Sequence, residues 1–314
     1  MHVTLVGAGA LGRVYGVRLA ASGTDVAFVV RPSRLAEASP FVIEQVTGPK
    51  RHDRLDAPER VAEVPRDTDA VLVTVRFDQL GPDLRDRLRS APAVPIAILT
   101  PLLPAEYAAL RSAIGGRVIA AMPGVSGYVD ERDVVRYWVV SVVSTLLDDP
   151  GEAAAGLRAA LEALARELHK AHLPARLERD VGSSNAATTT AFFPLIASID
   201  VGGGIDGLLA DKDLLSAAVD AAKECDALAG RIGKVASWAG LLTKFVGPFT
   251  LKPGVSFAKL VFPEAVRFVE AHFGAKLHAQ HLAMGEAILA VGRAHDADMP
   301  ALERVMARLR ARAD

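Results

Sequence analysis

The chain opens with Val3-Thr4-Leu5-Val6-Gly7-Ala8-Gly9-Ala10-Leu11-Gly12, in which a short apolar run passes directly into three spaced glycines. The apolar run predicts a buried strand, and the segment 10–22 that follows it predicts a helix. A Gly-x-Gly-x-x-Gly turn in this setting is typical of dinucleotide-binding folds. The alternative is a tight strand–helix turn that binds no ligand.

Each glycine of this turn has a physical reason to be there. Gly7 permits the tight turn, Gly9 lets the backbone approach a pyrophosphate, and Gly12 lets the helix pack closely on the strand. The N–H groups and the positive end of the helix would then face the phosphates. We therefore expect the cofactor contacts of the turn to come from Gly7, Ala8, Gly9, Ala10, Leu11 and Gly12.

The end of the second predicted strand, 25–30, distinguishes between the two nicotinamide dinucleotides. An NAD site usually carries an acidic residue at that end, but Asp25 lies at the start of the strand. The strand is instead followed by Arg31-Pro32-Ser33-Arg34. Because guanidinium groups form paired, charge-assisted hydrogen bonds with phosphate, Arg31 and Arg34 predict NADP(H). The alternative is a solvated surface loop.

The alternation of elements predicts an α/β domain followed by a helical one. Short apolar runs of the kind buried in parallel sheets occupy 3–6, 26–30, 70–75, 95–99 and 118–122, with a further strand at 137–146. Helices are expected at 10–22, 78–89 and 151–171, and after Leu177 at 213–231, 262–273, 276–295 and 301–313. We place the boundary near Pro174. This gives an NADP-binding Rossmann-like domain, 1–173, and a helical substrate and dimerisation domain, 174–314.

The composition excludes several classes of protein. With 314 residues, 51% of them hydrophobic, and a net charge of -1, the chain has the balance of a globular protein and no bulk positive charge to attract nucleic acid or a membrane. A single cysteine, Cys225, excludes an internal disulfide and four-cysteine metal sites. No secretory leader or long apolar span is visible, so we expect a cytoplasmic protein. The excess of Arg over Lys, 27 to 9, indicates a bacterial source.

The likeness to a known family extends beyond the glycine turn. Segments 3–12, 30–31, 70–76, 207–224 and 288–300 together resemble the ketopantoate reductase family, NADPH-dependent enzymes that reduce 2-dehydropantoate to pantoate. The resemblance implies a Rossmann-type domain followed by an all-helical domain of the 6-phosphogluconate dehydrogenase C-terminal type. Because ligands of open α/β sheets bind at the carboxyl ends of the strands, Arg76, Thr100 and Gly124, which follow later strands, are further candidate cofactor contacts.

The chain departs from the family at the residues that carry its chemistry. The family has a lysine where this chain has Arg76, and an Asn-Gly pair where it has Thr100-Pro101. The family's general acid, a lysine, aligns with Asp180. Since an ionised aspartate would repel a 2-keto acid, we expect the fold and cofactor to be kept but not the pantoate reaction.

Other polar residues take the positions of the family's substrate contacts. Ser184 and Thr188 align with asparagines of the family, Asn185 lies one place off, and Gln280 aligns with a glutamate, so these four are candidate substrate contacts.

Two histidines offer an alternative source of protons. His278 and His281 lie three residues apart on a predicted helix, so both can face one direction, and with Asp180 they are candidate catalytic residues. The alternative is a pair of ordinary buried or surface histidines. No carboxylate lies in register to complete a metal site, so no metal is expected.

These observations favour an NADPH-dependent oxidoreductase that reduces a carbonyl or imine of a small molecule other than ketopantoate. Two alternatives stay open: a non-catalytic NADP-binding module, and a genuine 2-dehydropantoate 2-reductase with rearranged site residues. A homodimer through the helical domain is an expected assembly. The apolar segment 240–262 suits a lid, a dimer interface or core packing.

Overall fold

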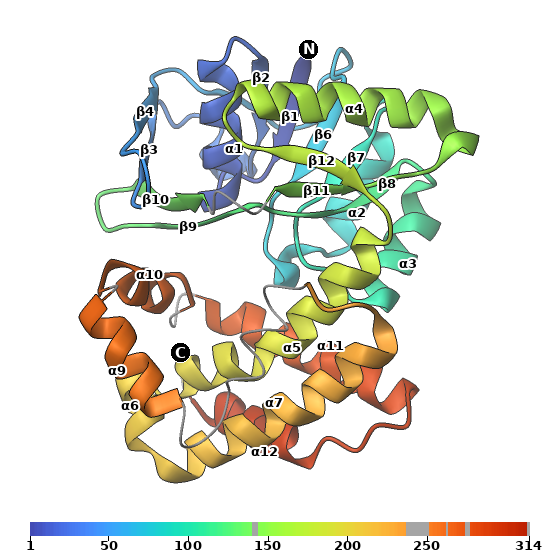
Figure 1. The fold of residues 1–314 in the computed structure, drawn as a ribbon. Coiled ribbons are helices and arrows are strands. Elements are labelled where there is room, and N and C mark those ends of the chain that lie inside the picture. Colours follow the sequence, from blue (N-terminus) through green and yellow to red (C-terminus); the bar gives the residue numbers. More distant parts are fainter. Residues whose placement is uncertain (140–143, 237–250, 262, 274–276, 313–314) are drawn as a thin grey trace. The chain divides into compact units, whose positions relative to one another are not determined.

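The computed structural model describes residues 1–139, 144–236, 251–261, 263–273 and 277–312 (Figure 1). The chain forms two compact units, Met1–Gly182 and Ser183–Asp314. The sequence places the division at 173/174 instead, and the intervening residues include strand β12, Ala175–Glu178, which pairs with β11 of the first unit. The assignment of cofactor and substrate roles to two domains stays a prediction.

The first unit is built on an eight-stranded sheet in the order β12-β11-β8-β7-β6-β1-β2-β5. All neighbouring strands run parallel except β11 and β8. The remaining strands are β1 His2–Val6, β2 Asp25–Val29, β5 Glu59–Val61, β6 Ala70–Val73, β7 Ile96–Ile98, β8 Val118–Met122 and β11 Thr145–Asp148. The five predicted parallel strands are thus confirmed as β1, β2, β6, β7 and β8.

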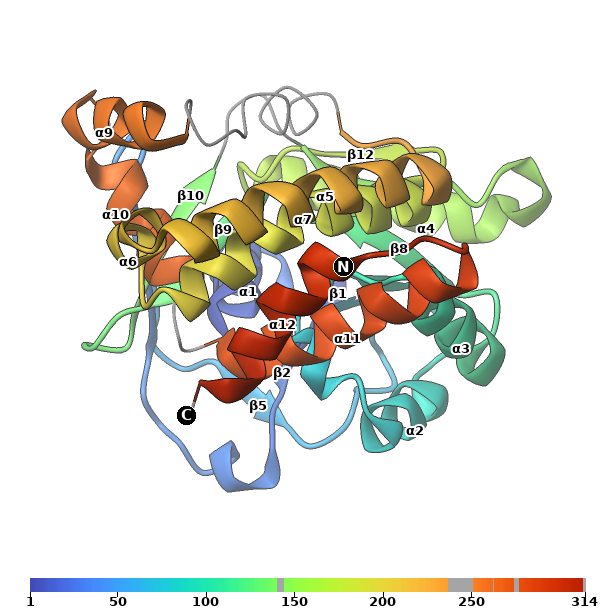
Figure 2. The same ribbon diagram turned by 90° about the horizontal axis from the view of Figure 1, so that it is seen from below.

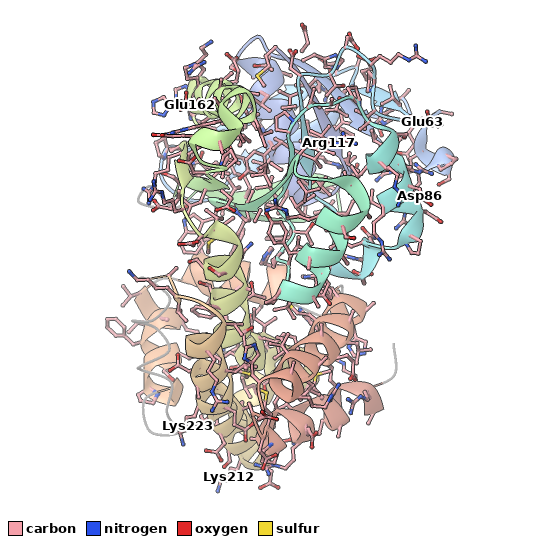
Figure 3. The ribbon with its side chains drawn as sticks, turned by 90° about the vertical axis from the view of Figure 1, so that its right-hand side faces the viewer. Glu63, Asp86, Arg117, Glu162, Lys212 and Lys223 are labelled. Atoms are coloured by element: carbon pink, nitrogen blue, oxygen red, sulfur yellow. The ribbon has the colours of Figure 1, made fainter. Side chains whose placement is uncertain are left out.

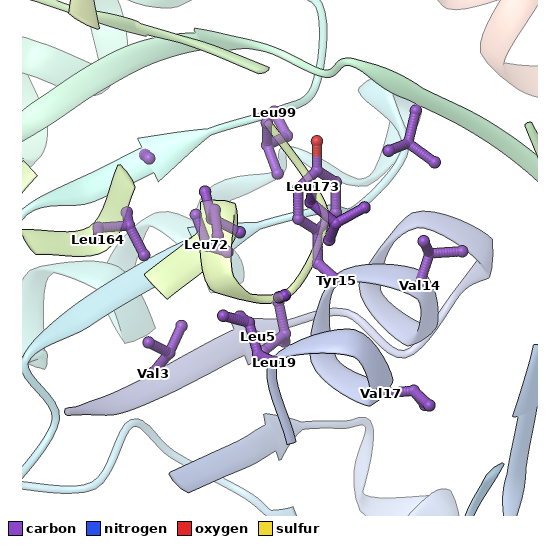
Figure 4. Packing of buried hydrophobic residues seen from close by; sticks show 14 of the residues in the cluster. Val3, Leu5, Val14, Tyr15, Val17, Leu19, Leu72, Leu99, Leu164 and Leu173 are labelled. Atoms are coloured by element: carbon purple, nitrogen blue, oxygen red, sulfur yellow. The ribbon is translucent and has the colours of Figure 1, made fainter. Parts of the chain in front are cut away.

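Both faces of this sheet are covered, which explains why its strands are continuously apolar. One face, with Leu5 and Leu72, packs against α1, Ala10–Ala21, and α4, Ala155–Lys170 (Figure 4). The opposite face, which includes Val6, packs against α2, Pro82–Ser90, and α3, Pro104–Ile114. Every residue of the central strands therefore loses its contact with water, whichever way it points.

A second, four-stranded sheet in the order β4-β3-β10-β9 packs against the other side of α1. Its strands are β3 Phe41–Gln45, β4 His52–Leu55, β9 Val125–Val129 and β10 Val134–Val139. The sequence analysis did not predict this sheet, and its single strand at 137–146 is wrong. That segment belongs to two strands, since β10 ends at Val139 in this sheet and β11 starts at Thr145 in the large one. Apolar composition alone does not show where a chain changes sheets.

Helix α1 therefore lies between two sheets, and it carries two buried cations. Arg13 donates from Nε to the carbonyl of Ala8 at 3.0 Å and pairs with Asp133 at 2.9 Å. Arg18 donates from Nε and Nη2 to the carbonyl of Ala171 at 2.9 and 2.7 Å and pairs with Asp53 at 2.8 Å. Buried charges are tolerated only when paired in this way. The two arginines fix the helix against three separate loops and strands.

Several shorter features differ in detail from the predictions. The helix expected at 78–89 is a short 3-10 turn, η2 Phe77–Gln79, followed by α2, because Gly81-Pro82 starts a new helix. The helix expected at 151–171 begins with a 3-10 turn, η3 Glu152–Ala154, before α4. Beyond the end of α2, Arg117 donates to four main-chain carbonyls, including those of Leu88 and Arg89, and so caps this helix.

The second unit is helical throughout its described part (Figure 2). The predicted helices are found as α7 Lys212–Ile232, α10 Pro263–Phe273, α11 His278–Ala294 and α12 Pro300–Ala311. They are joined by α5 Val181–Val201, which starts at the end of the first unit, α6 Ile205–Ala210 and α9 Leu251–Val261. Glu224 of α7 accepts the amides of Ala301 and Leu302, both at 2.9 Å, which fixes the start of α12 on α7.

Charged side chains cover the outside of each unit, as on Glu63, Asp86 and Glu162 of the first and Lys212 and Lys223 of the second (Figure 3). Within the described ranges, no helix has the length and apolar character needed to cross a bilayer.

Most of the apolar segment predicted at 240–262 lies outside the described residues, which omit 237–250. On α9, Phe257 and Leu260 are 63% and 82% exposed, so these two side chains do not pack in a core.

Candidate dinucleotide site and buried histidine cluster

The glycine turn joins β1 to α1 at the middle of the large sheet. Strand β1 lies between β2 and β6, so the strand order reverses there, and ligands of open α/β sheets bind at such a point. Gly7 has a φ of 106°, a conformation that side chains other than glycine rarely adopt, and donates its amide to Val29 at 3.1 Å. From the end of β6, Thr74 Oγ1 donates to the carbonyl of Gly7 at 2.9 Å.

Gly12 and Gly9 have contrasting surroundings. A Cβ placed on Gly12 would lie 1.9 Å from the carbonyl oxygen of Gly7, so only glycine fits there. A Cβ placed on Gly9 would meet no protein atom within 4 Å. Gly9 is also the N-cap of α1, which has no side-chain cap and no acidic residue in its first turn. The helix end therefore faces open space with its positive pole uncompensated, which fits a pyrophosphate.

The predicted phosphate-binding arginines follow β2. Arg31 is exposed, and no hydrogen bond or ion pair joins its side chain to another residue of the described chain. Arg34 ends a short 3-10 turn, η1 Pro32–Arg34, and holds Glu37 with one edge of its guanidinium, through Nε and Nη2. Its Nε lies 2.9 Å from Glu37 Oε1, and its Nη2 lies 2.9 Å from Oε2. The anion-binding face of Arg34 is thus filled by a carboxylate of the same loop.

The next predicted contacts lie at the ends of β6, β7 and β8. Arg76 forms a two-point pair with Asp78, at 3.0 Å from Nε and 2.9 Å from Nη2. Thr100 is buried and donates to the carbonyl of Val75. Gly124 is also buried, and its amide donates to Thr145 Oγ1 at 3.2 Å. The glycine turn, Arg76 and Thr100 thus lie at the carboxyl ends of three adjacent parallel strands. That each of them contacts a cofactor stays a prediction.

Asp180 occupies an exposed turn directly before α5, with a φ of 58°. The first amide of that helix, Val181, donates to Asp148 Oδ1 at 3.0 Å. Burial raises the pKa of Asp148, and the nearby charge of Asp180 raises it further. Asp148 and Asp180 are therefore neighbouring acidic residues of the first unit, while the alignment of Asp180 with the family's lysine stays a prediction.

The candidate substrate contacts of the second unit lie on α5 and α11. On α5, Ser184 is half-buried, while Asn185 and Thr188 are buried. Thr188 Oγ1 accepts the amide of Ala236 at 3.0 Å, so its hydroxyl oxygen already supports the chain beyond α7. Gln280 is half-buried on α11. Their contacts with a substrate stay predictions.

His278 and His281 lie inside the second unit, where they share one carboxylate. Their Nδ1 atoms lie 3.0 and 2.9 Å from the same atom, Oδ2 of Asp200. Arg312 donates to the other oxygen at 3.2 Å. Burial would raise the pKa of Asp200, but the hydrogen bonds from His281 and His278 outweigh it and lower the pKa. Nε2 of His281 is buried without a hydrogen-bond partner.

Asp200 is the residue of this cluster that the sequence analysis missed. The signal was a single carboxylate near the end of an otherwise uncharged helix, since such a charge is buried only with partners. Nδ1 of each histidine faces the carboxylate directly, and within the described ranges no group of three or more His, Cys, Asp or Glu side chains is arranged to hold a metal ion.

The fold and the glycine turn together are typical of one class of protein, the NAD(P)-dependent oxidoreductases that combine a Rossmann-type domain with a helical domain. Residues 3–100 match the family model of ketopantoate reductase PanE/ApbA. The predicted resemblance to ketopantoate reductases is therefore confirmed, in sequence over this segment and in fold over nearly the whole chain.

Solved structures share this fold at low identity. The 2-dehydropantoate 2-reductase from Geobacter metallireducens is 20% identical, with 99% of each chain covered and a TM-score of 0.69. A PanE/ApbA family ketopantoate reductase from Ralstonia eutropha is also 20% identical, with 99% of this chain and 98% of that chain covered and a TM-score of 0.69. A D-mandelate dehydrogenase with NADH and anilino(oxo)acetate is 15% identical, with 99% of this chain and 97% of that chain covered and a TM-score of 0.70. Among curated proteins, none matches the chain.

Proposed function

We propose that this protein is an NADPH-dependent oxidoreductase that reduces a carbonyl or imine of a small molecule other than ketopantoate. The observation that carries the proposal is the glycine turn. Gly12 closes it against Gly7, and Gly9 leaves open space at the start of α1, as a bound pyrophosphate requires. The bound nicotinamide would supply the hydride, and the chain would supply its position and a proton.

The choice of NADPH rests on the loop after β2. Arg31 points into solvent, and Arg34 lies three residues on, whereas β2 itself ends on Val29 with no acidic residue. A 2′-phosphate suits such a pair of guanidinium groups. One of the solved relatives, D-mandelate dehydrogenase, carries NADH, so the family fold also accommodates the cofactor without that phosphate.

The exclusion of ketopantoate rests on charge. Asp180 and Asp148 make the position of the family's lysine negative, which disfavours a substrate carboxylate there. A neutral carbonyl or an iminium compound avoids this repulsion. We therefore expect the preferred substrate to lack a carboxylate beside the reacting carbon.

Three residues are proposed to carry the proton. Asp180 is exposed in its turn, so water can reach its carboxylate, which would relay a proton from water to the substrate. His278 and His281 are buried and hydrogen-bonded to Asp200, which favours a structural role for the two histidines. Their acid–base role is separable by experiment, because a structural histidine changes stability and a catalytic one changes kcat.

The test is NADPH oxidation by the purified chain with a panel of 2-keto acids, including ketopantoate, and of neutral ketones, aldehydes and imines. We expect turnover with a neutral member and none with ketopantoate. Turnover with ketopantoate would establish the alternative of a genuine 2-dehydropantoate 2-reductase. Tight NADPH binding without turnover of any member would favour a non-catalytic module.

The same preparation tests the proton donors. With the substrate found, we expect Asp180→Asn to lower kcat and leave the melting temperature unchanged. His281→Gln is the comparison, because loss of its hydrogen bond to Asp200 should lower the melting temperature. A fall of kcat in His281→Gln without loss of stability would instead assign the proton to the histidine.

A homodimer is the assembly we propose. The support is a structural relative at 13% identity, described as the dimeric ketopantoate reductase from Staphylococcus aureus. Light scattering of the full chain gives the answer directly, and a monomer mass at all concentrations would contradict it.

A further inference from the structure

The loop after β2 contains a carboxylate that the sequence analysis did not use. Glu37 follows η1 and lies three residues beyond Arg34, in the part of a Rossmann domain that faces the adenosine ribose. An NAD site has an acidic residue at this ribose, and the end of β2 lacks one. Glu37 supplies a carboxylate to the same region from outside the strand.

Glu37 and Arg34 form a pair with full two-point geometry. Nε of Arg34 lies 2.9 and 3.0 Å from the two carboxylate oxygens, and Nη2 lies 2.9 Å from one of them. Both side chains are 35% exposed, so the pair is open to solvent and to a ligand. A phosphate would need the same donors of Arg34, because carboxylate and phosphate both bind the planar fork of a guanidinium.

Further arginines surround this pair. Arg13 of α1 and Arg60 of β5 each place a guanidinium 4.7 Å from the ring centre of Phe41. The hydrogen bond with Arg34 lowers the pKa of Glu37, and the charges of Arg60 and Arg13 lower it further. Glu37 is therefore an ionised carboxylate in a positively charged region.

Two of these arginines, Arg13 and Arg60, are already engaged elsewhere. Arg13 is buried and paired with Asp133, while Arg60 donates to the carbonyl of Ser39 at 2.6 Å. Arg34 is thus the cation whose Nε and Nη2 donors are occupied by Glu37. A 2′-phosphate that binds the Nε–Nη2 edge of Arg34 must displace the carboxylate from it, whereas a 2′-hydroxyl can donate to the carboxylate where it stands.

We propose that Glu37 sets the cofactor preference of this chain, by competing with the 2′-phosphate of NADPH for Arg34 and by accepting the 2′-hydroxyl of NADH. This inference rests on the proposed nicotinamide cofactor. Glu37 is a specificity-determining residue, and it makes the preference for NADPH weaker than Arg31 and Arg34 alone would produce.

The experiment measures Kd of the full-length chain for NADPH and NADH by fluorescence titration. We expect Glu37→Gln to bind NADPH about tenfold more tightly and NADH more weakly, because one ionic competitor and one hydroxyl acceptor are lost. Arg34→Gln should shift the ratio in the opposite direction. Asp86→Asn is the matched control, since Asp86 pairs with Arg89 in another exposed pair of the same spacing, and it should leave the ratio unchanged.

The fragments 2′,5′-ADP and 5′-ADP assign the effect to the ribose. Glu37→Gln should tighten the first and not the second. Equal changes for both dinucleotides, or no change, would overturn the proposal while leaving the cofactor assignment intact. Failure of the wild-type chain to bind either dinucleotide would overturn both, and hydride transfer in the panel assay reports on the proposed function separately.

Discussion

The two compact units support their candidate functional residues by different means. In the first, the dinucleotide turn is made of backbone: three glycines within six residues, a strand end on either side and a helix start. In the second, the histidines depend on one buried side chain, Asp200, which is hydrogen-bonded to two histidines of one helix, α11, and to Arg312. The first arrangement is local in sequence, while the second joins residues 78 and 81 positions apart.

This difference concerns how each region tolerates change. A backbone turn fails by steric overlap, and only at the glycine that the fold encloses. A buried carboxylate fails by leaving its partners unpaired, which costs more than the net strength of the bonds it made. Four substitutions or conditions test this contrast, in decreasing order of expected effect.

The largest effect is expected for Asp200→Ala. It would leave the buried rings of His278 and His281 and the partly exposed guanidinium of Arg312 without their acceptor, which we expect to cost about 3–5 kcal/mol of unfolding free energy. Urea denaturation measures the loss. Asp220→Asn is the control, because its pair with Lys223 is exposed and should contribute less than about 1 kcal/mol. Equal losses in both variants would show that the cluster is not a stabilising centre.

The glycine turn comes next. We expect Gly12→Ala to destabilise the protein by about 1–3 kcal/mol, because its Cβ would lie 1.9 Å from the carbonyl of Gly7. Gly9→Ala should leave stability nearly unchanged and weaken NADPH binding by about tenfold or more, since its methyl fills only the open space. Thermal unfolding with and without NADPH separates the two variants. A stable Gly9→Ala protein with unchanged affinity would argue against a pyrophosphate there.

A smaller effect is expected for Tyr15→Phe on α1. The buried hydroxyl lies 2.6 Å from Thr145 Oγ1, and burial raises the pKa of Tyr15 to about 12, so the phenol stays neutral. Its removal should cost about 1 kcal/mol, the usual contribution of one hydrogen bond. Tyr107→Phe is the control, because that hydroxyl makes only a long contact, 3.4 Å, with Val118. A greater loss in the control would contradict the prediction.

The smallest effect is a change with pH. The pKa of Asp200 is lower in the folded chain than its reference value of 3.8, so its stabilisation is fully present above that value. It is lost as the pH falls through the lowered folded value. The difference in stability between the wild type and Asp200→Asn should therefore narrow below about pH 4. Urea titrations at pH 7, 4 and 3 measure it, and a constant difference would contradict it.

Much of the first unit could be predicted from the sequence, since its strands are continuous apolar runs and its turn requires glycine. The second sheet could not, because its strands are short and only partly apolar, as His52–Leu55 shows. The prediction of one strand at 137–146 was wrong for a related reason. Both β10 and β11 are apolar, and the pairing partner of each strand decides which sheet it joins. In the second unit α7, α10, α11 and α12 were predicted, whereas α5, α6 and α9 were not.

Local rules thus account for the glycine turn, because the space and conformation that Gly7 and Gly12 need are set within a few residues of chain. Charge pairing followed only from the tertiary structure. It pairs Arg34 with Glu37 within one loop and Arg18 of helix α1 with Asp53 of strand β4. It also pairs Asp200 with two histidines of another helix. Coulomb and hydrogen-bond energies depend on the distance in space and on exclusion of water, and neither can be read from the order of residues.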